Sequence, residues 1–129
     1  MQFSKAAEYG LLGLTHLARE KNFAASVSEI ARAEKLSLYF LRNVFQKLRA
    51  AKLVDSIRGS GYTLAKKASE ISLKDVLDAT EQKTTIHACL KKKAAGCAHA
   101  PKCKIVRRLA GVQKGLDAEL AKIKITDLI

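Results

Sequence analysis

The sequence has little of what would hold a chain in a membrane or direct it out of the cell. Its 129 residues contain no tryptophan and a single proline. Runs of about 18 apolar residues do not occur, so no membrane span is expected. Near the N-terminus, Glu8 interrupts the apolar segment and no small-residue cleavage site follows, which is unlike a secretory signal peptide. We therefore expect a cytoplasmic protein.

Acidic residues are also scarce. The chain has 24 lysines and arginines against 12 aspartates and glutamates, which gives a formal net charge of +12. The imbalance is strongest between Lys83 and Arg108, where eight basic residues occur and no acidic one. Such a charge indicates an anionic partner, either nucleic acid or an acidic membrane surface. With 48% hydrophobic residues, the chain can still form a folded core.

Signatures of catalysis are missing as well. The sequence has no glycine-rich phosphate loop, no His-Glu-x-x-His motif, and no serine or cysteine nucleophile beside an evident base. It therefore predicts a binding protein and not an enzyme. The alternative from another class is a metal-dependent or thiol-redox enzyme built on the cysteine-containing segment, which would require a substrate pocket.

The residues from Ser26 to Leu64 have the pattern of a winged helix-turn-helix, which places one helix in a DNA major groove. Ser26 and Glu29 form a capping box at the start of the first helix. After a short turn, Ser37 is the expected N-cap of the second helix. Two short apolar runs then flank two glycines between residues 53 and 64, which predicts a tight β-hairpin, the wing.

The second helix of this module has an apolar stripe with the spacing of a buried face. The polar residues on its other side are therefore the expected DNA contacts. Between residues 42 and 67 seven basic residues face a single acidic one, Asp55, which supports this interpretation. We predict that base edges are contacted by Tyr39, Arg42, Asn43 and Gln46, and that phosphates or the minor groove are contacted by Ser37, Lys47 and Arg58.

Two more helices are expected around this module. Helical spacing predicts one from about Ser4 to Lys21, with Glu8 and His16 at its surface. A capping-box-like start at Ser72 predicts a short helix to about Ala79.

The last apolar residues step by three and four positions, as in a coiled-coil seam. A helix of this length at the end of a small domain has little core of its own to cover it. We therefore predict that it pairs in a homodimer, with packing against the first helix as the alternative. The predicted domains are residues 1–80 for DNA binding, 81–103 for the cysteine segment and 104–129 for the dimerisation helix and tail. The predicted dimer contacts are Ile105, Leu109, Val112, Leu116, Leu120 and Ile123.

Three clustered cysteines, Cys89, Cys97 and Cys103, carry the remaining chemistry. Their odd number argues against a disulfide framework, and their spacing does not match the paired C-x2-C units of common zinc sites. Thiolates select zinc, copper(I) and iron–sulfur clusters. An iron–sulfur cluster is favoured, while zinc, reactive thiols and inert buried cysteines stay open. The fourth ligand would be His87, His99 or a carboxylate from elsewhere.

The stretch LSLYFLRNVFQKLRAAKLVDSIRGSGYTLAKKASEISLKDVLDATE, followed by the cysteines, resembles the IscR/NsrR/RirA family of bacterial transcription regulators. The opening MQFSKAAEYGLLGL is similar too, so the resemblance covers nearly the whole chain. Its most specific parts are the wing with Arg58 and the ISLKDVLDATE helix. The spacing of the cysteines is similar to that of the iron-responsive rhizobial members.

This resemblance implies a mainly α-helical, homodimeric winged-helix regulator, expected to be a repressor, that binds double-stranded DNA at a pseudo-palindromic site. Many members hold a [4Fe-4S] or [2Fe-2S] cluster through three cysteines and sense iron, oxygen, nitric oxide or redox state. Here the implied ligands are Cys89, Cys97 and Cys103, with Glu8 of the partner subunit as the fourth, because related nitric-oxide sensors use a carboxylate there. A regulator of the same fold with structural zinc or a thiol switch is the alternative.

Overall fold

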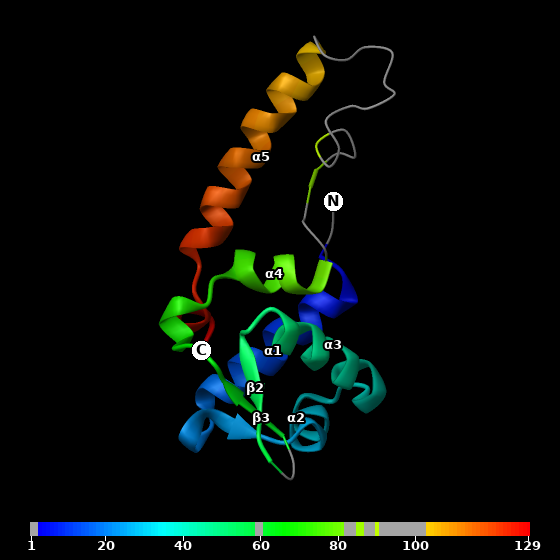
Figure 1. Ribbon diagram of the computed structural model, residues 1–129, viewed down its shortest axis with the longest axis vertical. Helices are drawn as coiled ribbons and strands as arrows, with labels where there is room; N and C mark the ends of the chain where they lie inside the picture. Colours follow the sequence, from blue (N-terminus) through cyan, green and yellow to red (C-terminus); the bar gives the residue numbers. More distant parts are fainter. Residues whose placement is uncertain (1–2, 59–60, 82–84, 87–89, 91–102) are drawn as a thin grey trace.

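A computed structural model describes residues 3–58, 61–81, 85–86, 90 and 103–129 of the chain. Figure 1 shows a helical body with a small sheet at one side and a long C-terminal helix that extends away from it. The helices are α1 (Lys5–Arg19), α2 (Val27–Glu34), α3 (Leu38–Ala50), α4 (Leu73–Glu81) and α5 (Lys104–Lys122). The strands are β1 (Ala24–Ala25), β2 (Val54–Ser56) and β3 (Tyr62–Leu64), and short 3-10 turns are η1 (Lys21–Phe23), η2 (Ala68–Glu70) and η4 (Ile125–Leu128). The predicted mainly α winged helix-turn-helix is confirmed.

Helix starts follow the capping signals in the sequence. The Ser26 hydroxyl accepts from the Glu29 backbone N–H at 3.1 Å and the Glu29 carboxylate accepts from the Ser26 N–H, so the predicted capping box is confirmed. Ser37 is the N-cap of α3, also as predicted. Ser72 and Asp75 exchange the same pair of bonds at the start of α4, which continues two residues beyond the predicted end, to Glu81.

Helix α1 lies at the centre of the core and contacts both α3 and α4. Its Leu14 and Leu17 are fully buried together with Phe45 of α3. The helix lacks a side chain at Gly13, where a Cβ atom would lie 2.7 Å from the Phe45 ring. At its start, the Ser4 backbone N–H donates to the Glu81 carboxylate at the end of α4.

The sheet contains one strand more than the predicted hairpin. Strand order is β1-β3-β2, all antiparallel, so β3 is central. Its Thr63 pairs with Ala24 of β1 on one side and with Asp55 of β2 on the other. The sequence predicted β2 and β3, but β1 has only two residues and shows no alternating pattern of its own.

The expectation that His16 is a surface residue is wrong, whereas Glu8 is exposed as expected. The His16 side chain is 12% exposed, and its Nδ1 and Nε2 atoms lie 3.0 Å from Glu34 and 3.1 Å from Glu20. Arg19 also reaches the Glu34 carboxylate, at 2.9 Å. The two contacts with Glu34 join the last turns of α1 to the end of α2, so they fix one half of the helix-turn-helix against the core.

Helix α5 has two different halves. Leu120, near its C-terminal end, is 7% exposed and packs with Ala7, Leu73 and Leu77, with Leu116 against this cluster. After α5 the chain runs beside the start of α4, where the Leu73 backbone N–H donates a hydrogen bond to the Ile123 carbonyl oxygen over 2.8 Å. The first turns of α5 instead extend away from the body (Figure 1), and there Ile105 and Val112 are 69% and 59% exposed. In the described parts of the chain no helix is long and apolar enough to cross a membrane.

We predict that Gly13→Ala destabilises the protein. The added methyl would overlap the Phe45 ring, which is fully buried and has no room to move outward. Overpacking of this kind destabilises a core by roughly 1–3 kcal/mol, and over most of that range this outweighs the ~1 kcal/mol gained when alanine replaces glycine in a helix. Gly111→Ala is the control, because no atom lies within 4 Å of its Cβ position, so this change should be neutral or stabilising. Urea unfolding of both variants measures the difference, and a Gly13→Ala protein as stable as wild type would contradict the packing argument.

Candidate nucleic-acid interface

Helix α3 presents one buried face and one exposed face. Its Leu41, Val44, Phe45 and Leu48 are at most 1% exposed, which confirms the predicted buried stripe. Residues that lie on the opposite side of a helix share a second face. In α3 this face is exposed throughout and carries Tyr39, Arg42, Asn43, Gln46 and Lys47.

The start of α3 is fixed by a residue that the sequence analysis did not single out, Tyr9 of α1. Its hydroxyl oxygen accepts a hydrogen bond from the Ser37 N–H at 3.1 Å. Its ring meets the Phe40 ring edge to face, with centroids 4.9 Å apart. The Lys5 ammonium lies 5.0 Å from the Phe40 ring centroid. A tyrosine on the buried side of a helix needs a partner for its hydroxyl, and this was the available signal.

Ser37 has two local roles at this point. Its hydroxyl accepts from the Phe40 N–H at 3.4 Å and so caps α3, while its own N–H is held by Tyr9. The turn before it is closed by Lys35 in the left-handed conformation, with φ of 56°, and by a 2.8 Å bond from the Leu36 N–H to the Ala31 carbonyl. The exposed Ser37 side chain lies at the edge of the α3 face.

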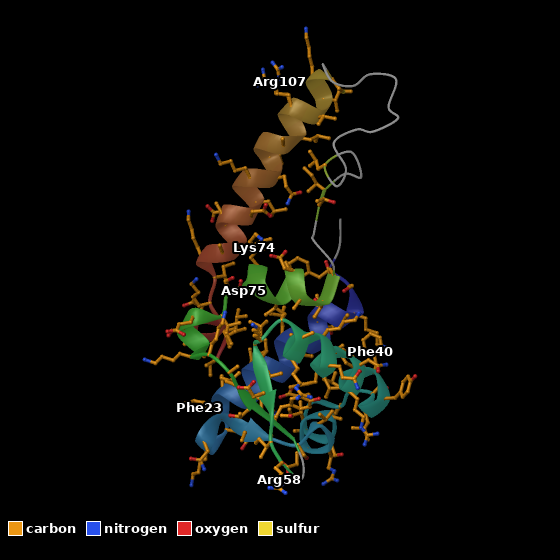
Figure 2. All side chains as sticks on the ribbon, in the orientation of Figure 1. Phe23, Phe40, Arg58, Lys74, Asp75 and Arg107 are labelled. Carbon is orange, nitrogen blue, oxygen red and sulfur yellow. The ribbon has the colours of Figure 1, made fainter. Side chains whose placement is uncertain are left out.

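The wing lies beside α3 and is held by close backbone packing. Gly61 has φ of +102°, and a Cβ atom there would lie 2.5 Å from the Ala25 carbonyl oxygen, so this position requires glycine. The Tyr62 and Phe45 ring centroids are 4.9 Å apart, which ties the hairpin to the buried face of α3. Arg58 is exposed at the hairpin end of β2, as Figure 2 shows.

The charge on this side of the molecule is predominantly positive. Within the described parts of the chain, Arg42, Lys47 and Arg58 form no salt bridge with any of the acidic residues. Their charges are therefore not neutralised internally. An exposed helix face and a hairpin with unpaired basic side chains can bind the phosphates that border a DNA groove.

Of the four predicted metal ligands, the structure describes two, Cys103 and Glu8. Cys89 and Cys97 lie outside the described residues. Cys103 is half-buried and directly precedes α5, while Glu8 is exposed in the first turn of α1. The described residues include no group of three or more side chains arranged to hold a metal ion.

Distance along α5 keeps Cys103 and Glu8 apart within one chain. Leu120 packs against Ala7, the neighbour of Glu8. Cys103 precedes Leu120 by 17 residues, which corresponds to about 25 Å of helix at a rise of about 1.5 Å per residue. A ligand set with both side chains therefore requires a second copy of the chain. The histidines considered as other ligands, His87 and His99, lie outside the described residues.

Comparison with known proteins connects this geometry to a family. Residues 3–129 match the model of the Rrf2 family, described as an iron-dependent transcriptional regulator. The chain is similar to the HTH-type transcriptional regulator IscR of Cereibacter sphaeroides, at 33% identity over 87 residues, which are 64% of this chain and 56% of that protein. It is also similar to Protein aau3 of Rhizobium meliloti, at 32% identity over 120 residues, 92% of this chain and 76% of that protein. The chain thus spans little more than half the length of that IscR.

Solved structures show the same fold. CymR, the global cysteine regulator of B. subtilis, superposes with a TM-score of 0.76 at 24% identity, covering 99% of this chain and 95% of that one. IscR of T. potens superposes with a TM-score of 0.71 at 24% identity, covering 99% and 85%. The resemblance read from the sequence is confirmed, and with it the prediction of a regulator in place of an enzyme. The chain belongs to the Rrf2 family of winged-helix transcriptional regulators.

Proposed function

We propose that this protein is a cytoplasmic, homodimeric repressor that binds a pseudo-palindromic DNA site with an affinity set by an iron–sulfur cluster. The observation that carries the DNA-binding part is the exposed face of α3, which lies opposite a fully buried stripe and beside a wing with an unpaired arginine. The family's description as iron-dependent supports the metal part.

Helix α3 would recognise the operator DNA. Tyr39, which is 77% exposed, and Arg42, Asn43 and Gln46 would reach base edges in the major groove. Lys47 and Ser37 would bind phosphates, and Arg58 would extend from the wing to the backbone or the minor groove. Phosphate contacts set the register of the protein on the duplex, and base contacts give the specificity.

The first turns of α5 would form the dimer interface. Ile105 and Val112 are exposed apolar side chains on one face of this helix, and Leu109 is between them, half-buried. Exposed apolar residues at this spacing are typical of a helix that packs against a second helix. A two-fold pair of reading heads matches a pseudo-palindromic site.

The charged residues that follow Cys103 suit a thiolate ligand at this position. Cys103 has Lys104 next to it, and Arg107 and Arg108 follow one turn later, so positive charge is available to offset anionic thiolates. Figure 2 shows Arg107 at the end of α5 that lies far from the body. Cys89, Cys97 and Cys103 would hold the cluster, with Glu8 of the partner subunit as the fourth ligand. When bound, such a cluster supplies a centre that responds to iron, oxygen, nitric oxide or redox state. Because Cys103 is continuous with α5, a change at this ligand acts directly on the helix proposed to join the two reading heads.

To test base reading, Arg42→Ala should weaken the binding free energy for the specific DNA site by roughly 1–3 kcal/mol and reduce the protein's preference for particular bases. Lys47→Ala should weaken specific and random DNA alike and reduce the salt slope by about one. Lys122→Ala is the control, since Lys122 is exposed at the far end of α5. Fluorescence anisotropy over a salt series measures all three. An equal loss on specific and random DNA would remove Arg42 from the base-reading set.

For the dimer, Val112→Lys should weaken self-association at least tenfold, about 1.4 kcal/mol. Val112 is 59% exposed within the chain, so the folded subunit should be unaffected. Ala110→Lys adds the same charge at an exposed position off the apolar stripe and should leave association intact. Sedimentation velocity at micromolar concentration measures the change, and operator affinity should fall in parallel. A monomeric wild-type protein under these conditions would exclude the dimer.

For the cluster, protein purified without oxygen should be brown and contain iron and sulfide, and Cys103→Ser should lose most of the colour. Glu8→Ala should retain a cluster with an altered visible spectrum that decays faster in oxygen or nitric oxide. Glu119→Ala, a change at an exposed acid of α5, should behave as wild type. Colourless protein with bound zinc would favour the structural-zinc alternative.

Control of DNA binding by the cluster has its own readout. Removing iron with a chelator in the absence of oxygen should change operator affinity at least tenfold, about 1.4 kcal/mol. If the two forms bind a set of operators equally, the cluster has no regulatory part.

A further inference from the structure

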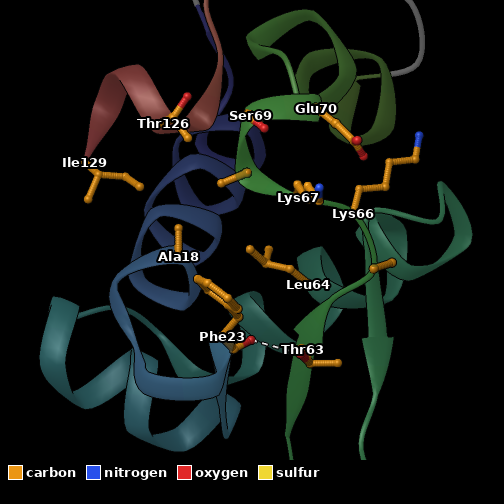
Figure 3. Close-up of a pocket in the computed structure, with 12 residues that line it drawn as sticks. Ala18, Phe23, Thr63, Leu64, Lys66, Lys67, Ser69, Glu70, Thr126 and Ile129 are labelled. Carbon is orange, nitrogen blue, oxygen red and sulfur yellow. Dashed lines mark hydrogen bonds between the residues drawn. The ribbon is translucent and has the colours of Figure 1, made fainter.

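A cavity of about 560 Å³ is lined by residues outside α3. Figure 3 shows that its walls come from the end of α1, η1, β3, η2 and η4, with Ala18, Phe23, Leu64 and Ile129 among the lining side chains. Pockets for small molecules are typically concave, mostly apolar and roughly 300–1,000 Å³ in volume. The cavity has the size and the lining of such a pocket, and neither DNA binding nor the cysteines use it.

Phe23 forms part of the cavity wall in an unfavourable backbone conformation. It has φ of 54° and follows Asn22, with φ of 63°, so two consecutive residues other than glycine are left-handed. A positive φ is unfavourable for a bulky side chain and tends to occur at functional sites. Phe23 does not gain burial in return, because it is 52% exposed. Its carbonyl is held by the Thr63 hydroxyl at 3.0 Å, which keeps the ring at the cavity.

The charged side chains that line the cavity favour a negatively charged ligand. Lys66 and Lys67 line it, against one acidic residue, Glu70. In Figure 3 the Lys67 side chain lies between Leu64 and Glu70, above the apolar lining. The chain as a whole carries a net charge of +12, which further favours an anion. An apolar interior below an ammonium group is complementary to a molecule with an apolar chain and one anionic end.

We propose that this cavity binds a small amphipathic carboxylate, with its apolar chain against Ala18, Leu64 and Phe23 and its carboxylate at Lys67. The site contacts β3, whose Thr63 pairs with both outer strands of the sheet. A ligand there touches one of the two strands of the wing. Binding itself does not rest on the proposed DNA or cluster function and is tested separately from both.

Isothermal titration of the full chain with octanoate tests the proposal, with octan-1-ol as the uncharged probe of the same length. Octanoate should bind with a dissociation constant of about 1 mM or tighter. Octan-1-ol should bind roughly two- to fivefold more weakly, the factor expected for one exposed ion pair. Lys67→Gln should weaken octanoate by the same factor without affecting octan-1-ol. Lys21→Gln, at an exposed position outside the lining, should change neither.

Two variants fill the cavity. Ala18→Phe on α1 should abolish binding of both probes, and circular dichroism should confirm its folding. Ala65→Phe repeats the test at an exposed lining position, where a larger side chain does not disturb the core. Absence of saturable octanoate binding would overturn the proposal. Binding that persists in both filled variants, or that is indifferent to the charge of the probe and of Lys67, would overturn it as well.

Discussion

The close approach of α1 and α3 is the constraint on which the rest of the structure depends. At Gly13 the two helices come so near that the Phe45 ring occupies the space of a side chain. One turn earlier, Tyr9 holds the backbone of Ser37, where α3 begins. The position and direction of α3, the helix proposed to read DNA, are therefore fixed by α1 and not by the helix-turn-helix alone. Because Phe45 also contacts Tyr62 of β3, the same packing orients the wing.

The parts of the fold that the sequence predicted are those determined by neighbours along the chain. The caps at Ser26, Ser37 and Ser72 each use a residue three positions later, and the stripe on α3 is a property of one helix. The parts that escaped prediction depend on partners far away in the sequence. His16 pairs with Glu34, and β1 exists only because β3 lies beside it. Local periodicity contains no information on such pairings.

The same distinction applies to the candidate sites. The exposed face of α3 could be predicted by subtraction of its apolar stripe, and all of the residues proposed to contact DNA are exposed. The contacts of Tyr9 and Lys5 that hold the start of α3 could not be predicted, because they depend on the packing of α1 against α3. The ligand set was inferred from cysteine spacing and a resemblance. Cys103 directly precedes α5, the helix that extends away from the body. The arrangement of the proposed ligands therefore depends on which groups lie near the start of α5, and the sequence does not determine this.

Among the described residues, helix α5 packs against the body near its C-terminal end, around Leu120, and its first turns extend away from it, so the helix can act as a lever that pivots at Leu120. From Leu120 to Cys103 the arm is about 25 Å long, so a tilt of only ~10° at the fulcrum moves Cys103 by ~4 Å. Conversely, a ligand bond that fixes Cys103 to within a fraction of an ångström fixes the tilt of the helix to about a degree. Under the proposed ligation of Cys103, the small apolar contact with Ala7, Leu73 and Leu77 would convert the precision of a bond length into the precision of an angle between α5 and the body that carries α3.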